Sequence, residues 1–158
     1  MKNNSGCVSN SKLEQGLLGV SWDVSHEDLE SAHPGGKWNR RTEAGTAYLE
    51  YSVKRAGKLF GTELVADLPL KFIFDIDGNQ PLNGLSCWLR VPLGGIPATV
   101  ERIQAACGPF LASNVQSGEY WTQFLRPGFV VLLQSRKPAA QHERLNLTVG
   151  YHRNGPMA

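Results

Sequence analysis

Residues 85–109 read LSCWLRVPLGGIPATVERIQAACGP, and this stretch contains the two patterns that decide the fold. In its first seven residues apolar side chains occupy every second position, which predicts a strand with one buried face. Further on, Val100, Ile103 and Cys107 recur at spacings of three and four, which predicts a short helix over residues 98–107. Gly-Pro follows and ends the helix. The stretch therefore predicts a strand followed directly by a helix.

Alternation also predicts strands on both sides of this stretch. The alternating segments are Thr46–Val53, Leu68–Asp75, Glu119–Leu125, Phe129–Gln134 and Arg144–His152. A further strand is expected over Leu59–Val65, paired through a turn at residues 55–58. Residues 75–79 (Asp-Ile-Asp-Gly-Asn) fit a hairpin turn, because Asp-Gly accepts positive φ. As a calcium loop they would lack the acidic ligand about 12 positions after the first. Antiparallel hairpins are the expected connections.

The same order of elements begins near the N-terminus. Ser25 is a suitable N-cap for a short helix over residues 26–33, which Pro-Gly-Gly ends at residues 34–36. This helix matches the one over residues 98–107 at an offset of 71 residues, and the match rests on element order more than on identical residues.

We therefore expect an α+β fold made of two tandem repeats, each a short helix followed by three or four antiparallel strands. The repeats are expected to form one sheet with the helices on one side. Residues 1–15 are expected to be a flexible leader. Residues 16–158 are expected to be a single domain made of the repeats 17–91 and 92–153.

Residues 93–100 (Leu-Gly-Gly-Ile-Pro-Ala-Thr-Val), closed by Cys107-Gly108-Pro109, resemble a recurring bacterial module. In that module a large apolar residue, Gly, any residue and Ser or Pro open a helix that leads into an antiparallel sheet. The segment is similar to the repeats of β-lactamase inhibitor protein and of small outer-membrane assembly lipoproteins, and two copies match the tandem inhibitor better. The resemblance implies helices on one side of a curved sheet whose other side binds a protein. No binding residue is carried over, because no motif here matches those of the inhibitor.

The composition excludes several classes of protein. The chain has 158 residues, of which 41% are hydrophobic and 19% charged, and its formal net charge is +2. This suits one compact domain. No apolar run approaches about 18 residues, so we expect no membrane span. No basic run alternates with aromatic residues, so we expect no nucleic-acid partner.

The polar start of the chain lacks the apolar stretch of a secretory signal. A cytoplasmic location is expected for the sequence as written, and a periplasmic one if a signal peptide was removed. Three cysteines cannot all pair within one chain, and we expect reduced thiols at Cys7, Cys87 and Cys107. Cys87 and Cys107 are expected to be buried. A disulfide between those two stays open as the alternative for an exported protein.

Motifs for catalysis and metal binding are incomplete. Residues 19–23 (Gly-Val-Ser-Trp-Asp) lack the last glycine of a nucleophile elbow, and residues 35–38 (Gly-Gly-Lys-Trp) lack the upstream glycine and the Ser or Thr of a phosphate-binding loop. His26 and His33 are seven residues apart, whereas a helical zinc pair prefers four. All four histidines are expected in solvent: His26, His33, His142 and His152. We expect no enzymatic activity, no cofactor and no metal.

The sheet face opposite the apolar sets carries the candidate site. It is expected to hold two Trp, a Tyr, an Ile and an Arg, which are residue types that dominate protein interfaces. The candidate partner-binding residues are Tyr48, Glu50, Lys71, Ile73, Trp88, Arg90, Trp121, Gln123 and His152. Trp121 and Gln123 are included because the 71-residue offset carries over from the first half. Further helices or a second copy in a homodimer would cover this face equally well.

These observations favour a non-catalytic protein-binding module. The most favoured function is that of an inhibitor or immunity protein, which neutralises a partner enzyme or toxin through the exposed sheet face. The alternatives are a bacterial envelope or assembly scaffold protein and, third, an enzyme of unrecognised type.

Overall fold

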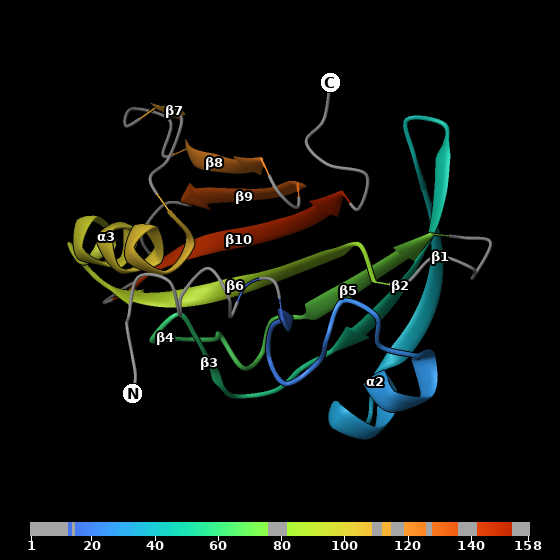
Figure 1. Ribbon diagram of the computed structural model, residues 1–158. Helices are drawn as coiled ribbons and strands as arrows, with labels where there is room; N and C mark the ends of the chain where they lie inside the picture. The colour runs from blue at the N-terminus through green and yellow to red at the C-terminus, as the bar shows by residue number, and fades with distance from the viewer. Residues whose placement is uncertain are drawn as a thin grey trace, which may run out of the picture.

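The expected α+β class is confirmed, with two helices and an antiparallel sheet in the described part of the chain (Figure 1). The computed structural model describes residues 13, 15–75, 82–108, 112–114, 119–125, 128–135 and 142–152. Residues 112–114, 119–125, 135, 142, 143 and 152 are described by their backbone alone.

The first half of the chain contributes one helix and six strands. These are α2 (His26–Ala32), β1 (Lys37–Glu43), β2 (Thr46–Val53), β3 (Lys58–Leu59), β4 (Thr62–Glu63), β5 (Leu70–Asp75) and β6 (Gly84–Pro92). The described second half contributes one helix and four strands. These are α3 (Ile96–Cys107), β7 (Ala112–Asn114), β8 (Glu119–Leu125), β9 (Gly128–Ser135) and β10 (His142–His152).

Eight of these strands form one sheet in the order β1-β2-β5-β6-β10-β9-β8-β7, and neighbouring strands within it pair antiparallel. The strands of each half are neighbours, and the halves join where β6 pairs with β10. The separation between the first residues of β2 and β8, 46 and 119, is close to the 71-residue offset. The separation between the first residues of β5 and β9, 70 and 128, is not. In the sequence, the β3–β4 hairpin comes between β2 and β5, and it has no described counterpart in the second half. Descent of both halves from one repeat stays a prediction.

The alternation read from the sequence places one face of the sheet in the core, as expected. In β6 the side chains of Leu85, Cys87, Leu89 and Val91 are at most 1% exposed. The register sets Leu85, Cys87 and Leu89 opposite Val149, Leu147 and Leu145 of β10, which are fully buried as well. Burying a side chain of this size contributes about 1.5–3 kcal/mol. The junction of the two halves is therefore also the centre of the hydrophobic core.

α2 begins where its sequence predicts. The backbone N–H of Asp28 donates to the hydroxyl of Ser25 at 3.1 Å, so the expected N-cap is confirmed. Leu29 is fully buried, and the ring of His26 lies 4.7 Å from that of Phe74 on β5. α2 is thereby fixed against the core side of the first half.

α3 confirms the helix predicted over residues 98–107 and starts two residues earlier, with Pro97 in its first turn. Its side chains Val100, Ile103 and Cys107 belong to the same hydrophobic cluster as the sheet. Neither described helix is both long enough and apolar enough to cross a membrane.

Trp22 links the segment before α2 to the second half of the sheet. Its ring centroid lies 5.5 Å from Phe129 and 5.2 Å from Tyr151, and these two rings stack on each other at 4.6 Å. The indole Nε1–H donates to the carbonyl of Leu13 at 2.7 Å. One core is therefore shared by both halves.

Two sequence predictions are wrong in this part of the fold. The single strand expected over Leu59–Val65 is instead the β3–β4 hairpin, because Phe60 and Gly61 take positive φ angles of 51° and 75° and reverse the chain. The strand β1 was not expected at all. Its sequence KWNRRTE is polar and almost entirely exposed, so it carries no period-two apolar signal.

The two described cysteines are buried and free, and burial raises the pKa of each thiol to about 12. Their predicted burial is confirmed; Cys7 lies outside the described residues. The expectation that all histidines lie in solvent is wrong for His33, which is 3% exposed, and His26 is half-buried between Trp38 and Phe74. The turn expected at residues 75–79 joins two strands that do pair antiparallel, but its residues after Asp75 lie outside the described part.

Candidate functional site

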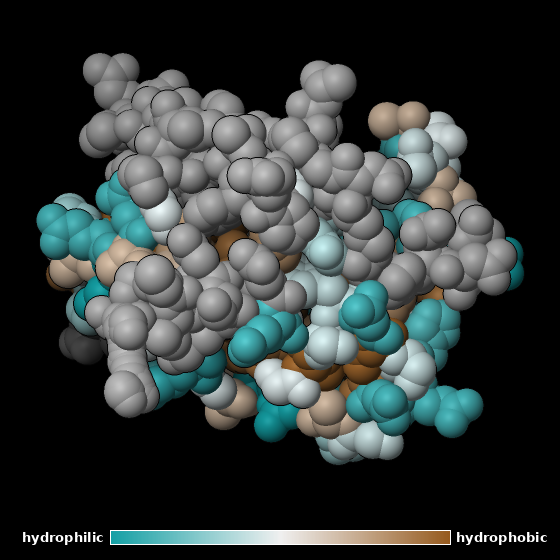
Figure 2. Space-filling view, in the orientation of Figure 1, coloured by the Kyte–Doolittle hydropathy of each residue, from teal (hydrophilic) through white to brown (hydrophobic). Residues whose placement is uncertain are grey.

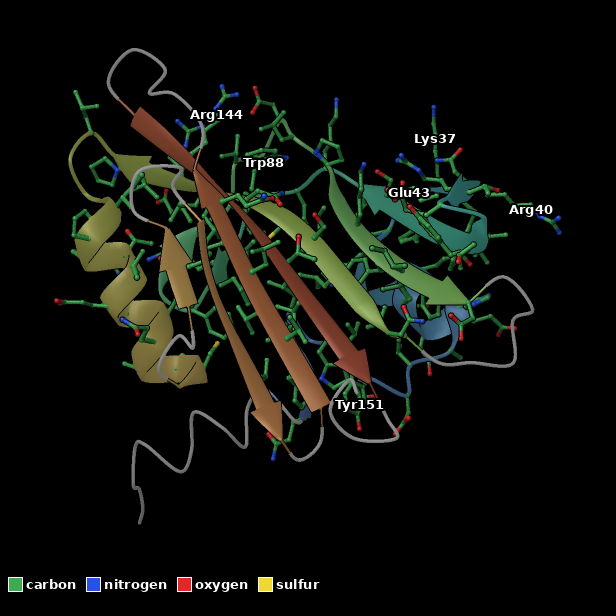
Figure 3. All side chains as sticks on the ribbon, turned by 90° about the horizontal axis from the view of Figure 1, so that it is seen from above. Lys37, Arg40, Glu43, Trp88, Arg144 and Tyr151 are labelled. Atoms are coloured by element: carbon green, nitrogen blue, oxygen red, sulfur yellow. The ribbon has the colours of Figure 1, made fainter. Side chains whose placement is uncertain are left out.

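The sheet face opposite the core is called here the outer face. Side chains alternate between the two faces along each strand, and the register shows which residues of adjacent strands lie beside each other on the outer face. Its described side chains on β2, β5, β6 and β10 are Tyr48, Glu50, Ser52, Lys71, Ile73, Asp75, Ser86, Trp88, Arg90, Arg144, Asn146 and Thr148. Figure 3 labels Trp88 and Arg144 near the start of β10 and Tyr151, which packs in the core, near its other end.

Within the described residues, both helices contribute side chains to the core. α2 reaches the core side of β5, and α3 contributes its apolar side chains to the same cluster. Figure 2 shows one face of the molecule, where hydrophilic side chains surround a hydrophobic area below the centre of the view.

The first charged group on the outer face is the Glu50 cluster, made of Arg41, Glu50 and Lys71. The carboxylate of Glu50 lies 3.5 Å from Nη1 of Arg41 and 3.9 Å from Nζ of Lys71. The register places these cations diagonally to Glu50 on the two neighbouring strands, which is within reach of long side chains. Glu50 is only 5% exposed, so this expected interface residue is enclosed by its own cations.

Tyr48 and Ile73 flank the Glu50 cluster and are both half-buried. The hydroxyl of Tyr48 donates to Oε2 of Glu43 on β1. This hydrogen bond raises the pKa of Tyr48 above its usual value. Tyr48 thus holds the end of the β1–β2 hairpin while keeping part of its ring in solvent.

The second charged group is the arginine patch, made of Trp88, Arg90 and Arg144. Arg90 on β6 and Arg144 on β10 are directly opposite each other in the register. Arg90 is exposed, and Trp88 and Arg144 are half-buried. The patch therefore combines an aromatic surface with two guanidinium groups at the junction of the two halves.

The backbone of β6 at the arginine patch is hydrogen-bonded on both edges, to the segment after β4 and to β10. The carbonyl of Trp88 accepts a hydrogen bond from the N–H of Val65 at 2.9 Å. Opposite Trp88 on β10, Nδ2 of Asn146 donates to the carbonyl of Cys87 at 3.1 Å, and Oδ1 of Asn146 accepts from the hydroxyl of Thr148 at 3.3 Å. The patch lies on a rigid part of the sheet rather than on a loop.

The structure brings together some of the sequence-predicted site residues and leaves others without a described side chain. Tyr48, Glu50, Lys71 and Ile73 gather over β2 and β5, and Trp88 and Arg90 lie on β6. By register, Trp121 pairs with Leu132, Gln123 with Val130 and His152 with Gly128; their side chains lie outside the described part.

Sequence reasoning missed Arg144. Its position alternates with the apolar Leu145 and Leu147, so its side of the strand was predictable. Its position opposite Arg90 was not, because nothing in the sequence indicates that β10 pairs with β6.

A cavity of about 720 Å³ opens elsewhere, between the loop of residues 15–21, the β3–β4 hairpin and Ala106 of α3. Leucine and glycine residues form much of its wall, and Lys58 is its charged side chain. His33 supports the loop from behind, since its Nε2 donates to the carbonyl of Leu18 at 2.8 Å. In the described ranges, no three His, Cys, Asp or Glu side chains gather as a metal site.

Comparison with known proteins adds no relative to this picture: no family model matches the chain, and neither a curated protein nor a solved structure matches it.

Proposed function

We propose that the chain is a non-catalytic protein-binding module that covers a partner enzyme or toxin with its outer face. The observation that carries the proposal is the arginine patch, in which a half-buried Trp88 lies beside Arg90 and Arg144. Trp and Arg are enriched among the residues that dominate binding energy at protein interfaces. Tyr48 and Ile73 extend the aromatic and apolar surface along the same face.

The proposal includes the resemblance to the repeats of β-lactamase inhibitor protein. It is supported by the element order, a helix followed by four strands of the large sheet in each half. On this proposal the two halves derive from one unit, both helices lie on one side, and the other side of the sheet meets the partner.

Site-specific photo-crosslinking tests the proposal. A photoreactive residue replaces Ser86, beside the arginine patch on the outer face, or, as the control, Glu27, which is exposed on α2. In extracts of the native host, position 86 is expected to capture one protein that position 27 does not. A crosslink to a second copy of the chain would identify a homodimer face and contradict the proposal.

The captured protein is then purified, and its Kd is measured for the parent chain and for Trp88→Ala. A Trp lodged in a partner's pocket typically contributes about 2 kcal/mol, so the variant is expected to bind at least about tenfold more weakly. An unchanged Kd would contradict the proposed face. If binding leaves the activity of a captured enzyme or toxin unchanged, the inhibitor function is wrong and the scaffold alternative replaces it.

A further inference from the structure

Arg90 and Arg144 form a cross-strand pair of like charges. Side chains directly opposite on adjacent antiparallel strands have Cβ atoms about 4.5–5.5 Å apart, and like charges at that separation destabilise the sheet. The register that creates this pair also aligns Leu89 with Leu145 and Cys87 with Leu147 in the core. The two guanidinium groups cannot separate by a register shift without exposing that core.

Neither arginine of the pair forms an ion pair with a described carboxylate. Both ion pairs of the described residues belong to Glu50, which takes up Arg41 and Lys71. The bridge between Leu64 and Leu89 brings Glu63 into register with Arg90 on the other side of β6, but no ion pair joins them. The register therefore sets two arginines opposite each other at the junction of the two halves, with neither one ion-paired in the described part.

We propose that the arginine patch binds a carboxylate from an acidic segment of the protein partner, with an apolar part of that segment against Trp88. The proposal rests on the proposed function, since it names the chemistry of the partner at the same face. Guanidinium groups present planar donor forks that match a carboxylate in a bidentate manner. A carboxylate between the two arginines converts their repulsion into attraction to a shared anion.

The small number of cations in the patch favours an acidic protein segment over a nucleic acid or a membrane. Extended polyanions require an extended row of cations. Two arginines beside one tryptophan match a single acidic side chain with an apolar neighbour.

A first experiment uses a short capped peptide with one Glu beside one Leu as the probe and isotope-labelled full-length chain at low salt. In NMR titrations the largest shift changes are expected at the backbone amides of β6 and β10 around Arg90 and Arg144. The double variant Arg90→Gln with Arg144→Gln is expected to weaken binding about tenfold. The matched control is Lys37→Gln with Arg40→Gln, which removes the same charge from exposed positions on β1 and is expected to keep the affinity (Figure 3).

Equal weakening by both double variants, or shift changes centred elsewhere, would overturn the proposal. So would tighter binding at the patch of a short single-stranded DNA or of vesicles containing phosphatidylserine.

A second experiment needs no ligand. If the pair is repulsive, Arg144→Gln raises the Tm by about 1–3 °C at low salt, and the difference shrinks at 1 M NaCl, where the Debye length is about 3 Å. A Tm that falls in this variant would overturn the proposal.

The captured partner separates this proposal from the proposed function. If Trp88→Ala weakens its binding but the double arginine variant does not, the carboxylate site is wrong and the binding face stands. If neither change affects binding, the proposed face itself is wrong.

Discussion

The Glu50 cluster and the arginine patch lie on one sheet face and differ in how their charges are balanced. In the Glu50 cluster a buried carboxylate lies 3.5 Å and 3.9 Å from two cations, so charge is neutralised within the sheet. In the arginine patch two cations stand opposite each other with no such partner among the described residues. A cation that is ion-paired with a carboxylate of the same chain stabilises the fold. A cation without such an ion pair can bind a carboxylate of a ligand.

The largest test of this contrast compares two tryptophans. Trp22→Ala is expected to lower the free energy of unfolding by about 3–5 kcal/mol, because the ring is 3% exposed and packs on Phe129 and Tyr151. Trp88→Ala is expected to cost below about 1 kcal/mol, since its ring is partly in solvent. Urea unfolding of both variants measures the difference. An equal loss of unfolding free energy in the two variants would mean that Trp88 belongs to the core, and the arginine patch would not be a binding surface.

The next test removes the carboxylate from the Glu50 cluster. Glu50→Ala leaves Arg41 and Lys71 facing each other without an anion and is expected to lower the free energy of unfolding by about 1–2 kcal/mol. This estimate is below that for a fully buried pair because the two cations are 43% and 32% exposed. Glu101→Ala, at an exposed position of α3, serves as the control and is expected to cost under about 0.5 kcal/mol. Similar costs for the two variants would remove the special role of Glu50.

The smallest expected effect concerns a third cation, Arg55, whose Nη1 donates to Nδ1 of His33 at 2.7 Å. Nε2 of His33 already donates to the carbonyl of Leu18, so the imidazole must stay neutral to accept from Arg55. Burial is the main cause that lowers the pKa of His33 below 6.5, and the nearby Arg55 lowers it further. The stability that depends on the neutral ring is therefore fully present above pH 6.5 and is lost as the pH falls towards the folded-state pKa.

This loss is measured as the urea midpoint between about pH 5 and pH 8. One proton changes stability by at most about 1.4 kcal/mol per pH unit. In His33→Gln the amide can still donate to Leu18 and accept from Arg55 but does not titrate, so its midpoint is expected to vary less with pH. If the difference between the parent chain and the variant is independent of pH, His33 does not carry the effect.

The strands that pack on the core could be predicted from the sequence, since their burial follows from alternation alone. Leu85, Cys87 and Leu89 on β6 and Leu145 and Leu147 on β10 are buried as their spacing indicates. The cap of α2 was equally local, because Ser25 satisfies a backbone donor three residues away.

What could not be predicted depends on which strands are neighbours. Glu50 has the parity of an outward residue, yet it is buried because β1 and β5 each bring a cation diagonally beside it. The edge strand β1 has no apolar periodicity and was not predicted, so the position of Arg41 beside Glu50 could not be predicted either. In the same way the opposition of Arg90 and Arg144 appears only once β10 is known to lie beside β6.

The position of β10 has a consequence for biosynthesis. This strand lies between β6 and β9 at the middle of the sheet, and the ribosome completes it after every other described strand. Until then β6 exposes an unpaired edge whose core side carries Leu85, Cys87 and Leu89. Such an edge can pair with other chains, so aggregation competes with folding during that interval. Closing the sheet joins residues far apart in the chain, which makes it a late and slow step of folding.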